Sequence, residues 1–207
     1  MKKVLFFILI LALAVAALGA VGIQGTTGAN GSANGIGAML RGTVLYSDAG
    51  LFALRGGVLV KIDPKTMQVQ GDALELLGPF PQFPEKTYQE DPGAFTAYYA
   101  EVNQRLAPAI MLLKDRMLLV VIGTNFFRVN LNTMKVEVKS SFAGPNDAGG
   151  SAGGPGNPPP AYELHDNILY LLRIREMVAV NITNGDAARV ALPEPMIKQL
   201  NPYQKPN

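Results

Sequence analysis

The chain of 207 residues contains no cysteine and no tryptophan. The absence of cysteine excludes disulfides, thiolate metal sites, a cysteine nucleophile and a cysteine-linked lipid anchor. The single histidine, His165, leaves no second imidazole for a metal site. The carboxylates show no calcium-loop spacing, and the sequence has no Walker loop and no dinucleotide-binding motif. We therefore expect no metal, no cofactor and no catalytic residue.

A strong net charge is also missing. The chain has 18 Lys and Arg residues against 16 Asp and Glu residues. Lys2 and Lys3 precede an apolar run at the N-terminus, and without these two residues the charges balance. No basic run occurs elsewhere, so the sequence lacks the electrostatic pattern of a protein that binds a phosphate backbone. We expect no nucleic-acid partner.

The N-terminus has the pattern of a targeting segment. Lys2 and Lys3 are followed by the uninterrupted apolar run Val4–Leu18 and then by small residues that suit cleavage. We predict that residues 1–22 are a signal peptide and that the chain is exported to the periplasm, the cell envelope or the extracellular space. The alternative is an uncleaved membrane anchor, because Val4–Ile23 carries no charge and is about long enough to span a bilayer.

The same strand–turn–strand pattern occurs three times along the rest of the chain. Short apolar stretches alternate with turn residues over residues 43–70, 109–139 and 161–192. Each unit must bury its apolar face on a neighbour, so the pattern predicts one β-repeat domain over residues 39–193. A flexible Gly-rich leader, residues 23–38, would precede this domain, and a tail, residues 194–207, would follow it.

Turn signals divide each unit into four strands. We predict an all-β fold of three four-stranded antiparallel meanders, arranged like the blades of a partial β-propeller, with one inserted amphipathic helix. The runs Met117–Ile122 and Ile168–Leu172 are almost continuously apolar, whereas a strand covered on one face alternates. Both runs therefore predict sheets that are covered on both faces. A single β-sandwich or barrel made from the same strands is the alternative.

Two inserts interrupt the repeat, at residues 78–108 and 143–160. Both leave after the last strand of a unit, so the repeat places them on one face of the assembly, where repeat proteins usually bind. The second insert is rich in Gly and Pro and is expected to be a disordered loop. Its segment Gly149–Gly153 matches the G-x-S-x-G nucleophile pattern, but no helix can follow, so the match is compositional.

The first insert is predicted to contain a helix. Asp91 suits the N-cap and Pro92 suits the first helical position. Glu101 and Arg105 are spaced to form an i,i+4 ion pair on one side of this helix. The opposite side is an apolar stripe: Phe95, Tyr98, Tyr99, Val102 and Leu106.

This stripe has two interpretations. The helix could pack against the edge of the sheets, as most amphipathic helices do. Alternatively, Phe95, Tyr98 and Tyr99 could form an aromatic platform that binds a protein, a peptide or a glycan. These three are the candidate binding residues.

His165 lies between Glu163 and Asp166 in a predicted turn, where we expect it to be exposed. An enzyme, or the remnant of one, would need a pocket in which His165, Asp166 and Arg173 converge. The arrangement of these three side chains therefore tests the enzyme hypothesis.

The segment Ile62-Asp63-Pro64-Lys65-Thr66, which follows Val58-Leu59-Val60, resembles the blade repeat of quinoprotein-like β-propellers. In that family a strand ends in an Asp-x-x-Thr-Gly turn that leads to the outermost strand. Asn132-Thr133 and Thr183-Asn184-Gly185 look like degraded versions of this turn. The resemblance implies blade-like sheets.

The chain departs from that family at several points. Met67 stands where the family usually has glycine, and the tryptophans that lock adjacent blades are missing. No cofactor or catalytic residue is therefore carried over from the resemblance. Closed propellers have at least four blades, and three units leave open ends. We expect self-association, with two chains giving six blades, or cover of the gap by the aromatic insert.

These observations favour an exported, non-catalytic binding or scaffold protein with a propeller-like repeat domain. One alternative is an enzyme or enzyme remnant related to propeller oxidoreductases or hydrolases. Another is a structural protein of the cell envelope that is held by an uncleaved N-terminal helix; a membrane contact is expected only in that case. Each of these three interpretations is compatible with a homo-oligomer.

Overall fold

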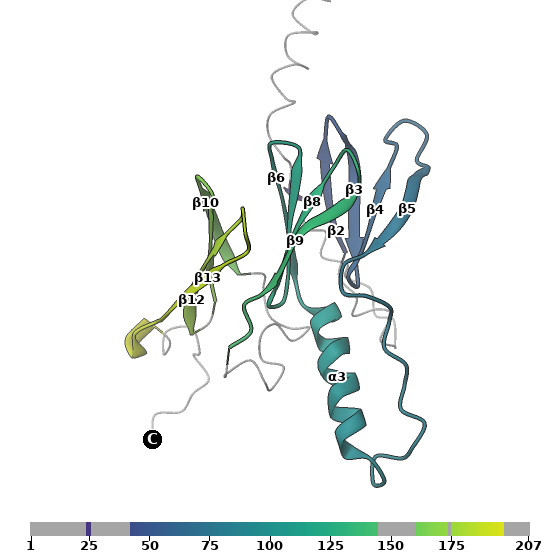
Figure 1. Cartoon of the computed structure of the whole chain (residues 1–207), viewed down its shortest axis with the longest axis vertical. Helices are drawn as coiled ribbons and strands as arrows, with labels where there is room; N and C mark the ends of the chain where they lie inside the picture. The colour runs from purple at the N-terminus through teal and green to yellow at the C-terminus, as the bar shows by residue number, and fades with distance from the viewer. Residues whose placement is uncertain (1–23, 26–41, 145–159, 174, 197–207) are drawn as a thin grey trace, which may run out of the picture.

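The computed structural model describes residues 24–25, 42–144, 160–173 and 175–196. In these residues, thirteen strands form three separate antiparallel sheets (Figure 1). Along the chain, one long helix follows the first sheet and precedes the second. The first sheet has the order β1(Gln24–Gly25), β2(Gly42–Ser47), β3(Gly50–Arg55), β4(Val58–Ile62) and β5(Val69–Glu75). The second has the order β6(Ala109–Lys114), β7(Met117–Ile122), β8(Asn125–Asn130) and β9(Lys135–Ser141). The third has the order β10(Ala161–His165), β11(Ile168–Leu172), β12(Glu176–Asn181) and β13(Ala187–Ala191).

The predicted fold class is confirmed. Each sheet contains a four-stranded antiparallel meander in sequence order, and no barrel closes among the described residues. The expected leader contributes a two-residue strand, β1, which pairs with β2. The first unit was predicted to end at residue 70, but its last strand, β5, continues to Glu75. This strand begins only at Val69, because Met67 still belongs to the preceding turn.

One turn recurs at the same place in all three units, between the third and fourth strands of each meander. Its fifth residue donates its N–H to the carbonyl of the first at 2.8 Å in every unit: Met67 to Asp63, Met134 to Asn130, and Gly185 to Asn181. The side chain of each first residue also accepts a backbone N–H two positions on, at 2.8, 3.0 and 2.9 Å. The fifth residue has positive φ in each case, 58°, 50° and 82°.

This shared turn means that the three units repeat in detail. The second strands of the meanders, β3, β7 and β11, begin at Gly50, Met117 and Ile168. Equivalent positions therefore differ by 67 residues from the first to the second unit and by 51 from the second to the third. The fifth residue of the turn obeys both offsets.

The first and second sheets pack face to face through one apolar cluster. The first sheet contributes alternate residues, among them Phe52, Leu54 and Leu59, which are almost fully buried. The second sheet contributes one face, including Leu118, Val120, Ile122, Phe127 and Val129. At roughly 1.5–3 kcal/mol for each large apolar side chain, burial of this kind is the main force that holds the two sheets together.

The opposite face of the second sheet packs against the third sheet. Leu119, Val121 and Phe126 point to this side and meet the inner face of the third sheet. That inner face consists of Leu169, Leu171, Val178, Val180 and Ile182. The second sheet is therefore covered on both faces, as its continuous apolar strand Met117–Ile122 predicted, and five of the six residues of β7 are buried.

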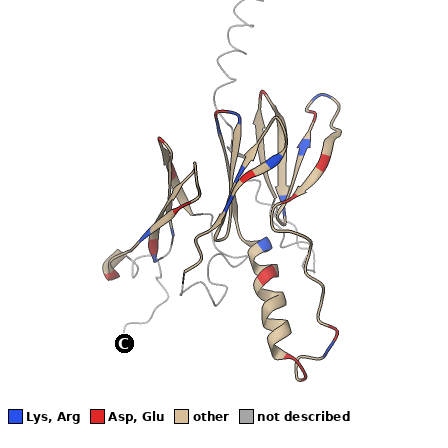
Figure 2. Ribbon diagram, in the orientation of Figure 1, with Lys and Arg blue, Asp and Glu red and all other residues tan. Residues whose placement is uncertain are grey.

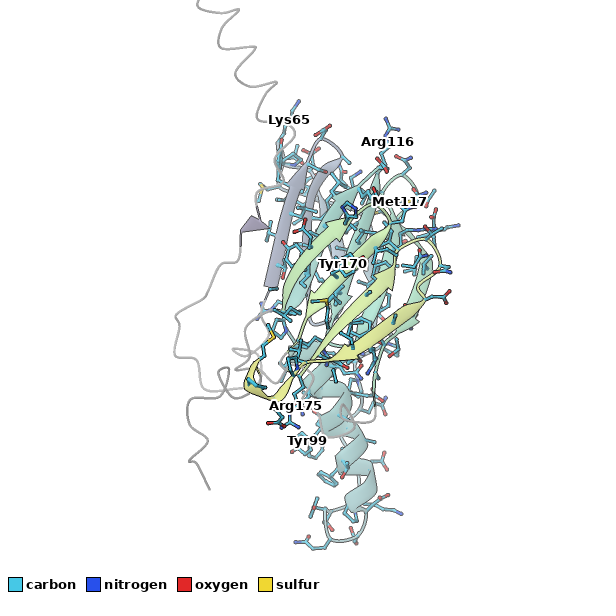
Figure 3. All side chains as sticks on the ribbon, turned by 90° about the vertical axis from the view of Figure 1, so that its left-hand side faces the viewer. Lys65, Tyr99, Arg116, Met117, Tyr170 and Arg175 are labelled. Atoms are coloured by element: carbon cyan, nitrogen blue, oxygen red, sulfur yellow. The ribbon has the colours of Figure 1, made fainter. Side chains whose placement is uncertain are left out.

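The same prediction is wrong for Ile168–Leu172. In β11 the burial alternates, because Leu169 and Leu171 point to the second sheet while Tyr170 points away from it. The third sheet stands at the end of the stack, and no other sheet of the described residues covers its far face. Figure 3 looks onto this far face, with Tyr170 near its centre.

Polar contacts fix the spacing of the second and third sheets near one end of their strands, where the β10–β11 and β12–β13 turns lie side by side. The Arg128 guanidinium donates to the carbonyls of Ile182 and Thr183, each at 3.1 Å. The Lys114 ammonium donates to the Asn167 side-chain oxygen at 3.0 Å and also to the Asp166 carbonyl. These contacts keep the packed faces aligned.

The long helix α3(Pro92–Leu106) extends from one end of the sheets (Figure 1). The turns that contain Lys65 and Arg116 lie at the opposite end (Figure 3). The chain enters and leaves a four-stranded meander at the same end of its strands, so β5 and β9 both lead toward the end that carries α3. The predicted signal peptide, most of the leader, the Gly149–Gly153 match and the end of the tail lie outside the described residues.

Candidate functional site

The candidate site is a group of aromatic side chains in the first insert. We refer to it as the aromatic cluster: Phe80, Phe83, Tyr88, Phe95, Tyr98 and Tyr99. The last three belong to α3, and the first three belong to the segment that leads from β5 to the helix.

The start of α3 forms as the sequence predicts. The Asp91 carboxylate accepts the backbone N–H of Ala94 at 2.9 Å, and Pro92 occupies the first turn. Just before it, the Glu90 carboxylate accepts the Thr87 backbone N–H at 2.8 Å and the Thr87 hydroxyl at 2.9 Å. The bond from the Thr87 backbone N–H and, to a smaller extent, the bond from the Thr87 hydroxyl lower the pKa of Glu90 below its usual value. The chain is thereby ordered as it enters the helix.

The end of α3 is anchored by an arginine in a way that the sequence did not predict. Arg105 is only 4% exposed, and its guanidinium donates to four backbone carbonyls: Gly56, Leu77, Gly78 and Pro79. The predicted ion pair with Glu101 on an exposed side is therefore wrong. Gly56 lies in the turn between β3 and β4, so Arg105 fastens the helix to the first sheet and to the start of its own insert.

The second sheet supplies further contacts to the same end of the helix. The Asn125 amide donates to the Gln104 side-chain oxygen at 3.1 Å, and Asn125 begins β8. Val102 and Leu106 are buried as the apolar stripe predicted. The C-terminal half of α3 is therefore held by two sheets, while the N-terminal half extends beyond them (Figure 1).

The aromatic cluster surrounds this extended half. Its rings meet edge to face: Phe83 lies 5.4 Å from Phe95 and 5.2 Å from Tyr98, measured between centroids, at interplanar angles of 88° and 80°. Tyr88 meets Phe95 at 5.7 Å, and Tyr98 meets Tyr99 at 5.3 Å. Edge-to-face pairs at these separations are each favourable by about 0.5–1.5 kcal/mol beyond area burial, so the rings hold one another in place.

Much of the aromatic surface nevertheless faces solvent. Four members of the cluster are 50% to 61% exposed: Phe80, Phe83, Tyr88 and Tyr99. Charge is absent from the helical surface beside them, because Glu101 and Arg105 are the only charged residues of α3 and both lie in its anchored half (Figure 2). The Arg105 guanidinium also lies over the Phe80 ring, 5.2 Å from its centroid. The result is an ordered surface with exposed aromatic rings, next to which the preceding loop carries the exposed charged residues Glu85, Lys86 and Glu90.

The three residues singled out from the sequence occupy different layers of the cluster. Phe95 is buried and forms its floor, Tyr98 is half-buried, and Tyr99 is half exposed. The structure adds Phe83 and Tyr88 to the surface, although neither belongs to the helical stripe. Helical periodicity cannot find residues that fold back from a preceding loop; the density of aromatics in the insert was the available signal.

The residues named for an enzyme do not converge. The His165 and Asp166 side chains are 77% and 88% exposed in the turn between β10 and β11. Arg173 follows the other end of β11, where it pairs with Glu176. These positions give the enzyme alternative no pocket with converging polar groups. In the described part of the chain, no three His, Asp or Glu residues are grouped so as to hold a metal ion.

No protein-family model matches the chain, and no curated protein matches it either. Among solved structures, it is similar to two chains described as extracellular domains of a one-component and of a hybrid two-component system, both from B. thetaiotaomicron. Each is 14% identical, with TM-scores of 0.39 and 0.38, over 73% and 72% of this chain. This chain spans 15% of the length of each.

The chain is also similar to the CNH domain of AfRom2, at 12% identity and a TM-score of 0.35. That alignment covers 82% of this chain and 50% of the other. Similarities at this level assign neither a family nor a function. No helix in the described residues is both long and apolar enough to cross a membrane.

Proposed function

We propose that this chain is an exported, non-catalytic binding protein and that its aromatic cluster contacts a polypeptide partner. Export is supported by the N-terminal residues 1–22. The binding role is supported by one observation above all: three aromatic side chains, each at least half exposed, are held by edge-to-face ring contacts around the extended half of an anchored helix. These are Phe83, Tyr88 and Tyr99.

Ordered exposed aromatics of this kind have a cost in an isolated protein. Large contiguous apolar patches on a soluble surface mark interaction sites more often than not. Tyr and Phe are enriched at the centres of protein interfaces, because they bring much contact area while few rotamers are lost. The cluster has this composition, and its rings are already locked by their neighbours, which lowers the entropy that binding would lose.

The ring geometry favours a polypeptide over a glycan. A sugar ring is usually bound by stacking on an open aromatic face, whereas these rings lie at 74° to 88° to one another. Steeply inclined rings form ridges and notches rather than a flat platform. An uneven surface of this kind suits side chains that insert between the rings. Binding of a glycan is the alternative that the experiment below also examines.

The test is a selection of linear peptides from a random library on the full exported chain. Peptides that bind should lose at least about tenfold in affinity when Phe83 or Tyr99 is replaced by serine, as expected for central interface residues. Met67→Ser is the matched control, since Met67 is more exposed and lies in a turn at the end opposite to α3.

Two results would contradict the proposal. One is binding that is equally strong in the Phe83→Ser, Tyr99→Ser and Met67→Ser variants. The other is a glycan array in which a sugar binds the wild-type chain, and loses binding in Phe83→Ser and Tyr99→Ser, while no selected peptide depends on these residues.

A further inference from the structure

The two interfaces inside the chain follow one packing rule. Phe52 and Leu54 of the first sheet point to the second sheet, and their equivalents Leu119 and Val121 point from the second sheet to the third. Each sheet therefore uses the same face to cover the next sheet along the chain. We refer to this as the forward face and to the opposite side of each sheet as the backward face.

The backward faces obey the same rule. Leu169 and Leu171 of the third sheet receive the second sheet, and their equivalents Leu118 and Val120 of the second sheet receive the first. The stack is thus directional, with a forward face packed on a backward face at both internal interfaces. It ends with one face of each kind that no described residue of a further sheet covers.

The free forward face belongs to the third sheet. Its central residues are Tyr170 and Leu172 of β11, the equivalents of Leu119 and Val121, and Met177 of β12, the equivalent of Phe126. Tyr170 and Met177 are each 37% exposed. Val190 and Ala179 continue the apolar surface across β13 and β12. Figure 3 views this face directly.

The free backward face belongs to the first sheet. Leu51 and Ala53 of β3 and Val60 and Ile62 of β4 are the equivalents of Leu118, Val120, Phe127 and Val129, which are fully buried in the second sheet. Tyr46 of β2 lies beside Leu51 on the same face and is exposed. Every one of these side chains is apolar or aromatic, although none is covered by another sheet.

We propose that a second copy of this chain covers both free faces, so that the forward face of each copy packs on the backward face of the other. The argument is continuity with the two interfaces already present. Most positions that the internal interfaces use also carry apolar residues on the free faces; the exceptions are Arg55, the equivalent of Ile122, and Glu163, the equivalent of Leu112. One free face is a forward face and the other is a backward face. A forward face therefore has its structural complement only on a backward face.

Such a contact joins two different surfaces and is heterologous. A heterologous contact closes into a ring when the rotation between copies permits it, and otherwise it continues as a filament. Two copies contribute six four-stranded meanders, within the range of four to eight blades that closed propellers use. The inference concerns the ends of the stack and does not rest on the role of the aromatic cluster.

Light scattering on the full exported chain gives the first test. The wild-type chain should have the mass of two chains, unchanged on dilution over the working range. Tyr170→Asp places a charge in the free forward face, and Tyr46→Asp places one beside the free backward face. Each variant should have the mass of one chain, while Tyr88→Asp, an equally polar change at an exposed tyrosine of the aromatic cluster, should remain a pair.

Mixing the two variants gives the decisive arm. A Tyr170→Asp chain keeps its backward face, and a Tyr46→Asp chain keeps its forward face. In the mixture one unaltered interface can therefore form, and the mass of two chains should return. A contact between two forward faces or between two backward faces cannot be restored in this way.

Three results would overturn the proposal. The first is a wild-type mass of one chain, which would mean that another segment of the chain, or nothing, covers these faces. The second is a mass that rises steadily with concentration, as a filament would show. The third is a pair that Tyr170→Asp and Tyr46→Asp leave intact.

Discussion

At the scale of single residues, the turn between the third and fourth strands carries most of the evidence for the repeat. Three different residues, Met67, Met134 and Gly185, occupy the same left-handed position. This conformation costs roughly 1–2 kcal/mol for a residue with a β-carbon and little for glycine. The repeat is therefore hard to recognise from the sequence in two of the three units, because methionine occupies a position whose backbone conformation favours glycine.

Replacement of Met67 by glycine should raise the free energy of unfolding by about 0.5–1 kcal/mol, since strain is removed and the lost side chain is exposed. Met134→Gly is the matched comparison. Met134 has the same backbone conformation, but its side chain packs on the first apolar cluster, so the gain should be cancelled or reversed. Urea denaturation measures both. Equal effects from the two variants would show that the packing of the Met134 side chain does not offset the gain from relieved strain.

The first residue of the same turn is an aspartate in one unit and asparagine in the other two. The N–H groups of Lys65 and Thr66 bond to the Asp63 carboxylate and lower its pKa below the ordinary value. A lowered pKa in the folded state means that the carboxylate stabilises the fold above the pKa of the unfolded chain and loses this effect as the pH falls through the folded value.

Asp63→Asn should therefore remove a pH dependence while it keeps the turn, because Asn130 and Asn181 form the same bonds in their units. Wild type and variant should differ in stability near neutral pH and converge as the pH falls through the lowered folded-state pKa of Asp63, as measured by urea denaturation over a pH series. A difference that stays constant over the acidic range would contradict this account of the turn.

At the scale of elements, the positions of the strands and of the helix were predictable from the sequence, whereas the contacts between these elements were less predictable. Apolar runs and turn residues located all twelve strands of the meanders, and the pair Asp91-Pro92 placed the start of α3. The largest error is the end of the first unit, which was predicted at residue 70, whereas β5 continues to Glu75. The role of Arg105 was not predictable, because its partners are backbone carbonyls, and any residue type can supply these. The surface contributed by Phe83 and Tyr88 depends in the same way on a loop that folds back.

Arg105→Met should destabilise the protein by about 2–4 kcal/mol, because four carbonyls lose a charged donor that is almost fully buried. The variant should also loosen the insert, seen as faster amide exchange in α3 than in β7. Glu101→Met is the control on the same helix, and its effect should stay within about 0.5 kcal/mol, since Glu101 is exposed. Equal losses in the two variants would mean that Arg105 does not anchor the helix.

At the scale of the whole molecule, the order of the sheets follows from which faces are apolar. The continuous run of β7 correctly predicted cover on both sides, whereas the similar run of β11 did not. Composition alone cannot separate these two strands, because β11 is apolar on both of its sides, although only one side is buried. Only the position of each unit in the stack distinguishes them, and a single chain's sequence does not state which unit stands at an end.

The most direct test of the stacked arrangement places aspartate at adjacent positions of two strands. Neighbouring residues point to opposite faces, so Val120 and Val121 test both sides of the second sheet, and Leu171 and Tyr170 test the two sides of the third. The measured quantity is the loss in free energy of unfolding, compared in a Tyr46→Asp background, in which the chain is expected to be single. Val120→Asp, Val121→Asp and Leu171→Asp should each lose at least about 3–5 kcal/mol, and Tyr170→Asp should lose less than about 1 kcal/mol. Tolerance of aspartate at either Val120 or Val121 would show that one face of the middle sheet meets water, and the stacked arrangement would then be wrong.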